Sequence, residues 1–155
     1  MVFVDFLTER FKQKIVHFHI KFLKIRIMSQ EIYDDLGQLG SLVMLGTMVA
    51  AVDGSFEESE FESIVDGFVK FANEDAATPE HFAKTMDKVK NAHQTLGTFE
   101  NKVKYAATVL NTFKSDFDAD TRKAILGVYN DIAMADLEMH PNEAALLGLY
   151  AKHLL

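Results

Sequence analysis

The chain has 155 residues, of which 48% are apolar and 25% charged, and this composition is typical of a single globular domain. The absence of cysteine excludes disulfides, thiolate metal sites and a cysteine nucleophile, and the net charge of −7 argues against a general nucleic-acid binder. Two prolines and eight glycines are few for a turn-rich sandwich or barrel, so the composition predicts an all-α fold.

Residues 1–28, called the arm below, are basic and strongly apolar. Six basic residues and two acids give the arm a net charge of +4, so that the body, residues 29–155, carries −11. This change of sign predicts a boundary at residue 28. Apolar side chains recur at helical spacing, which favours a helix over the strand-like alternation within residues 16–22. The members of this helical face are Phe11, Ile15, Phe18, Phe22 and Ile25.

Charged residues recur every few positions along the arm, which excludes a signal peptide and a membrane span. Three interpretations stay open. The arm packs as a helix on the body or on a partner subunit. Alternatively, it lies as a basic amphipathic helix on an anionic membrane surface. In the third interpretation Met28 is the true start, and residues 1–27 come from an upstream start assignment or are poorly ordered.

Apolar residues of the body recur with a period near 3.6 and predict about six helices with short connections. Residues 42–52 contain no charge, which predicts a buried central helix, too short to cross a membrane. Thr78 and Thr98 stand where helix N-caps are expected, and the acids of residues 116–120 open another helix. Pro141 opens the last one. The predicted fold is one compact helical domain with the arm as an N-terminal extension.

An internal repeat relates two parts of the body. Residues 48–60 and residues 131–143 each contain an Ala-rich helix end, an Asp, an apolar residue three positions later and a Glu seven positions after the Asp. The offset of 83 residues is too long for a solenoid and predicts two similar helix–loop–helix halves.

Folding alone accounts for most of this repeat. Asp53 and Asp136 leave a helix and are expected to bond backbone N–H groups in the turn. Gly54 supplies the positive φ that such an exit often needs. Glu60 and Glu143 stand third in the following helices, where a carboxylate reaches back to the cap residue.

These residues resemble the tellurite-resistance TerB family and its TerB-like relatives, in which an A-x-A-D-G-x-Φ-x-x-x-E loop occurs twice in a small acidic helical protein. The first copy matches at residues 50–56 and Glu60, and the second at residues 133–136 with Met139, Pro141 and Glu143. Leu137 and His140 depart from the family pattern. The resemblance extends over about residues 40–155 and leaves the arm without a counterpart.

The resemblance implies a pseudo-symmetric domain of helical hairpins, no established enzymatic activity, and a role in tellurite and related stress resistance beside membrane-associated and calcium-binding protein partners. It also makes the loop acids candidate ligands for calcium or magnesium. These acids are Asp53, Glu57, Glu60, Asp136, Glu138 and Glu143. Each loop offers three acids at most, so a dissociation constant of about 10⁻⁴ to 10⁻³ M is expected. In the structural alternative, Glu60 and Glu143 are occupied as helix caps.

Other patterns point to structural roles. The acids of residues 116–120 begin like an EF-hand loop, but its sixth position is Thr121 and its twelfth is Gly127. His93 lies on an apolar helix face and is expected in the core or at a helix end. His140 is expected as an N-cap, with a metal site beside Asp136 and Glu138 as the alternative. The sequence contains no P-loop, Rossmann or G-x-S-x-G motif.

The sequence therefore predicts a non-enzymatic, TerB-like stress-associated protein that binds a protein partner and, weakly, a divalent cation. Nucleic acid is not expected as a partner, and a homo-oligomer stays open. The alternatives are a small metal-dependent hydrolase that uses clustered acids and a purely structural oligomeric module. We expect a cytoplasmic protein, with the inner face of the membrane as a peripheral location.

Overall fold

The computed structural model describes residues 2–72, 79–135 and 140–155, and nearly all of these residues are helical. A 3-10 turn, η1 (Val69–Phe71), follows the second helix. The helices are α1 (Val2–Ala50), α2 (Glu58–Phe68), α3 (Pro79–Leu96), α4 (Phe99–Asp116), α5 (Ala119–Ala135) and α6 (Pro141–Leu154). No strand occurs within the described ranges, and the predicted all-α fold is confirmed.

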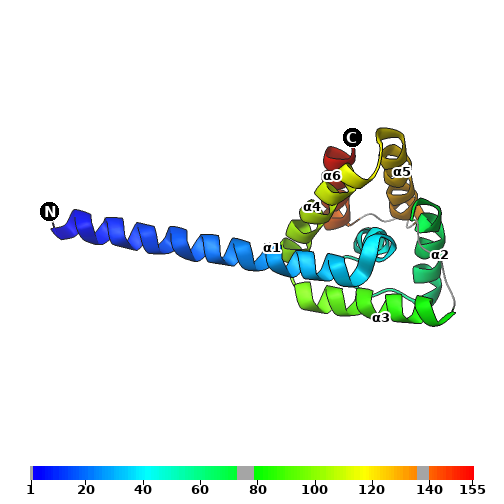
Figure 1. Cartoon of the computed structure of the whole chain (residues 1–155), viewed down its shortest axis with the longest axis horizontal. Coiled ribbons are helices and arrows are strands. Elements are labelled where there is room, and N and C mark those ends of the chain that lie inside the picture. Colours follow the sequence, from blue (N-terminus) through cyan, green and yellow to red (C-terminus); the bar gives the residue numbers. More distant parts are fainter. Residues whose placement is uncertain (1, 73–78, 136–139) are drawn as a thin grey trace.

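Helix α1 is broken at Gly37. This residue has φ 71° and ψ −175°, a conformation that is essentially restricted to glycine. The break separates an outer part, residues 2–36, from a central helix, residues 38–50 (Figure 1). The helix runs through Met28 without interruption, so the change in charge at residue 28 is not a break in the backbone.

The central helix lies in the middle of the body, and α2 to α6 are arranged around it (Figure 1). All five of these helices contact α1. Leu42, Met44 and Met48 are fully buried, as the uncharged stretch predicted. Two buried tyrosines also bond to the backbone of the central helix: Tyr129 of α5 donates to the carbonyl of Leu42 at 3.0 Å, and Tyr150 of α6 donates to that of Leu45 at 2.9 Å.

Capping residues define several helix starts. The Thr98 hydroxyl accepts a bond from the Asn101 N–H at 3.1 Å, which confirms this predicted N-cap. The Asp118 carboxylate accepts from the Thr121 N–H at 2.7 Å, so the acids of residues 116–120 do open a helix. Thr78 lies outside the described residues.

The arm projects from the body as a single helix (Figure 1). Eleven of its large apolar side chains are 41–65% exposed. They are Val4, Phe6, Leu7, Phe11, Ile15, Val16, Phe18, Ile20, Phe22, Leu23 and Ile27. Within the described part of the chain, neither this helix nor any other combines the length and apolar character that a membrane crossing requires. Contact with the body core begins only near Met28 and the buried Ser29.

We expect the body to fold without the arm. A protein truncated to begin at Met28 should melt within about 5 °C of the full chain, which corresponds to about 1 kcal/mol for a domain of this size. Thermal unfolding followed by circular dichroism measures this difference. An insoluble or molten truncated protein would mean that the arm contributes to the core.

Candidate functional site

The first loop of the repeat, residues 51–57, is a tight turn between α1 and α2. The Gly54 N–H donates to the Ala51 carbonyl at 2.8 Å, and Gly54 has φ 80°. The Asp53 carboxylate accepts from the Ser55 N–H at 2.9 Å, and this bond is the main cause that lowers the pKa of Asp53. The expected roles of Asp53 and Gly54 in the turn are confirmed.

His93 of α3 lies directly beneath this loop. Its side chain is 4% exposed, and a Cβ atom added to Gly54 would lie 2.8 Å from the His93 Cγ atom. The Thr47 hydroxyl donates to the Met44 carbonyl at 2.7 Å, so the His93 Nε2–H must donate to that hydroxyl, at 2.8 Å. The buried Nδ1 of His93 has no hydrogen-bond partner among the described residues, which favours the neutral tautomer with the proton on Nε2.

Lys102 of α4 supports the same loop from the other side. It is 3% exposed, and its Nζ donates to the Val52 carbonyl at 2.6 Å. Burial lowers the pKa of Lys102, and the nearby charge of Asp53 opposes this shift. Burial, reinforced by the Lys102 charge, lowers the pKa of His93 to about 4. The loop thus lies over two buried titratable groups, the Lys102 amine and the His93 imidazole, and His93 is neutral at neutral pH.

The cap positions of the two loops are equivalent. His140 accepts from the Asn142 N–H at 3.1 Å, and the Glu143 carboxylate accepts from the His140 N–H at 3.2 Å. In the first loop the Glu60 carboxylate accepts from the Glu57 N–H at 3.4 Å. The predicted caps are confirmed.

The six candidate metal ligands are only partly described. Asp136 and Glu138 lie outside the described residues, so the equivalence of Asp53 and Asp136 stays a prediction. Glu60 lines a hollow of about 780 Å³ between α2 and α5, together with Asp66 and Asp131. The described residues contain no group of three acidic or histidine side chains that could hold a metal ion.

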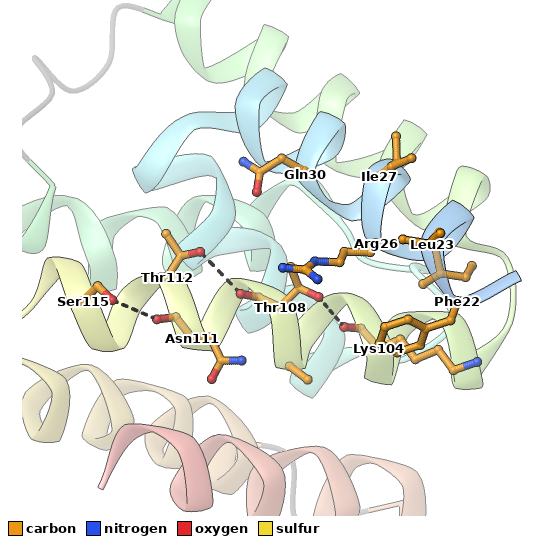
Figure 2. Close-up of a pocket in the computed structure, with 12 residues that line it drawn as sticks. Phe22, Leu23, Arg26, Ile27, Gln30, Lys104, Thr108, Asn111, Thr112 and Ser115 are labelled. Atoms are coloured by element: carbon orange, nitrogen blue, oxygen red, sulfur yellow. Dashed lines mark hydrogen bonds between the residues drawn. The ribbon is translucent and has the colours of Figure 1, made fainter. Parts of the chain in front are cut away.

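A groove of about 850 Å³ separates the arm from α4 (Figure 2). Phe22, Leu23 and Ile27 lie on the arm side together with Arg26, and the α4 side consists of Lys104 and smaller, mostly polar residues. The hydroxyl groups of that side are used within α4, since Thr108 donates to the Lys104 carbonyl at 3.1 Å and Thr112 to the Thr108 carbonyl at 3.4 Å. The methyl groups of Thr108 and Thr112, beside the polar ends of Lys104 and Asn111, are therefore among the side-chain groups that can contact an occupant.

The comparison with protein families identifies the body. The family model of the tellurite resistance protein TerB matches residues 39–154. This chain belongs to the TerB family. The match begins two residues after Gly37, so the arm lies outside the matched TerB region. No curated protein and no solved structure matches the chain.

Two features of this TerB protein were not predicted from the sequence. The first is the burial of Lys102, although this residue shares one helix face with Tyr105, Ala106 and Val109, and a lysine within such an apolar face indicates a buried lysine. The groove beside α4 could not be predicted, because it depends on the angle at which the arm leaves the TerB domain.

The buried neutral His93 should make stability depend on pH. The pKa of His93 is about 6.5 in the unfolded chain and about 4 in the folded one, so the unfolded state binds more protons between these values. The free energy of unfolding should therefore fall as pH drops through this window, by up to about 3 kcal/mol.

Urea unfolding of the wild type and of His93→Gln, at about pH 7 and about pH 4.5, measures this effect. The variant should show a smaller loss of stability on acidification, whereas the control His17→Gln, in the exposed arm, should behave as the wild type. An equal loss in all three proteins would show that His93 does not titrate as described.

Weak binding of calcium or magnesium by the loop acids stays a prediction, and it involves Asp136 and Glu138, which lie outside the described residues. Glu60 and Glu143 already accept capping bonds, which leaves few carboxylate oxygens free, so we expect a dissociation constant of about 10⁻³ M. Calorimetric titration should detect this binding in the wild type and lose it in the double variant Asp53→Asn, Asp136→Asn. Equal heats in both proteins, or no heat at millimolar cation, would contradict the prediction.

Proposed function

We propose that this TerB-family protein is a non-enzymatic, stress-associated binding protein whose arm docks on a protein partner. The proposal rests on one observation, the eleven large apolar side chains that are exposed along the arm. Contiguous exposed apolar surface of this kind marks interaction sites. Weak cation binding at the loops is the secondary part of the proposal.

The energetics of a lone helix support a partner for the arm. Most helical stability in proteins comes from packing of an apolar face against other elements. On the N-terminal side of Phe22 the arm extends past the groove beside α4. The apolar side chains of this part are therefore not buried against the body. A partner that covers the arm would supply the missing burial.

The distribution of apolar residues around the arm favours protein over lipid. One face of the arm helix carries apolar residues at spacings of three and four positions from Val4 to Ile25. We call it the first face. A second set lies on the opposite side of the helix, namely Val16, Ile20, Leu23 and Ile27. A helix that lies flat on a membrane has one apolar and one polar side. Apolar groups on two opposite sides do not match that arrangement and favour packing against other helices.

Site-specific photo-cross-linking tests the proposed function. A photoreactive phenylalanine analogue replaces Phe18 on the first face, or exposed Lys123 of α5 as the matched control, in the cells that naturally make the protein. We expect a discrete protein adduct at position 18 and none at position 123. Adducts with lipid alone, or no adduct at position 18, would contradict a protein-docking role.

A further inference from the structure

We propose that the arm binds a second copy of this chain, with the two arms antiparallel. This inference rests on the proposed protein-docking function and names its partner. The first face of the arm consists of Val4, Leu7, Phe11, Ile15, Phe18, Phe22 and Ile25.

The first face continues an interface that already exists in the molecule. Further along the same side of α1, Ser29 and Leu36 are buried, and Ile32 and Tyr33 are partly buried against the body. These positions extend the same spacing of three and four residues. The helix therefore uses one side to pack on its own body, and that side stays apolar for about six further turns where the body has ended.

The spacing of the first face suits a two-helix seam. The six steps from Val4 to Ile25 advance 21 positions, an average of 3.5 residues per step, which is the period of a coiled-coil seam. The pattern is also nearly symmetric about a point between residues 14 and 15. In an antiparallel pair with that centre, Val4 meets Ile25, Leu7 meets Phe22, and Phe11 meets Phe18. Six of the seven residues of the first face thus meet an apolar residue of the second copy.

Charge favours the antiparallel over the parallel arrangement. The two acids of the arm, Asp5 and Glu9, lie in its outer third, whereas Lys21, Lys24 and Arg26 lie near the body. Antiparallel arms bring these opposite charges to the same level, although Glu9 also lies 3.5 Å from Lys12 of its own helix. Parallel arms would instead align like charges along their whole length.

The acidic bodies add a stronger preference. Each body carries a charge of −11, and parallel arms would bring two bodies to the same end. Antiparallel arms separate them by the length of an arm, about 40 Å. This distance is several times the Debye length of about 8 Å at physiological salt, so the mutual repulsion is screened.

The groove beside α4 receives the second arm in this arrangement. Its arm side includes Phe22 and Ile25 of the first face. In the antiparallel register these two residues meet Leu7 and Val4 of the second copy. The outer end of each arm thus lies at the mouth of the other copy's groove, which Lys104, Thr108 and Thr112 of α4 line on the far side.

Sedimentation of the full chain tests the association. We expect a dimer of twice the 17.5 kDa chain mass. Phe11→Glu should raise the dimer dissociation constant about tenfold or more, because it places a charge in the seam. Phe6→Glu is the matched control, since Phe6 is similarly exposed but lies off the first face, and it should leave the dimer intact. A monomeric wild type, or equal effects of the two variants, would overturn the inference.

Disulfide trapping tests the register, because the natural chain contains no cysteine. A mixture of Val4→Cys and Ile25→Cys proteins should form a disulfide between positions 4 and 25, and each protein alone should form little. A dominant bond between two copies of position 4 would indicate parallel arms and overturn the inference. Transfer of the arm from the dimer to anionic phosphatidylserine vesicles would overturn it as well, in favour of a membrane.

The outcome is separable from that of the proposed function. If the chain is monomeric and the photoreactive residue at position 18 forms an adduct with a different protein, the docking function stands and the second-copy inference fails. If position 18 forms no protein adduct, both fail.

Discussion

Burial of the central helix, residues 38–50, is the constraint on which the rest of the structure depends. A helix that is apolar on all sides must be covered on all sides, and the five remaining helices contact α1 around it. Tyr129 and Tyr150 add hydrogen bonds from α5 and α6 to its backbone, and these bonds fix the positions of α5 and α6 against the central helix. The turn at Asp53 and Gly54, supported by Lys102, then leads the chain from the buried end of the central helix to the surface.

The course of α1 on the N-terminal side of the central helix also explains why the arm needs a partner. Gly37 redirects α1, so that residues 2–36 run outward and pack on the body only from about Met28 to Leu36, while residues 38–50 form the centre of the core. The side of α1 that packs on the body at Leu36 stays apolar out to Val4, where the body no longer covers it. An apolar face that continues beyond its own domain calls for a second surface of similar character, and a second arm in the antiparallel direction offers one without bringing the two acidic bodies together.

Sequence patterns predicted the local structure well and the arrangement in space less well. The uncharged central helix and the caps at Thr98, Asp118 and His140 were predicted because burial and capping depend on neighbours along the chain. The break at Gly37 was not, since the charge pattern pointed to residue 28 and a glycine within an apolar period also fits an intact helix. The bond between His93 and Thr47 joins residues 46 positions apart, and the groove beside α4 joins residues still further apart, which periodicity cannot relate.

Hydrogen exchange of the arm amides tests most directly whether the first face is covered in solution. At concentrations where the dimer forms, we predict that amides of residues 4–25 exchange slowly, and that this protection disappears on dilution while the central helix stays protected. Fast exchange throughout the arm at every concentration, beside a protected central helix, would contradict the account.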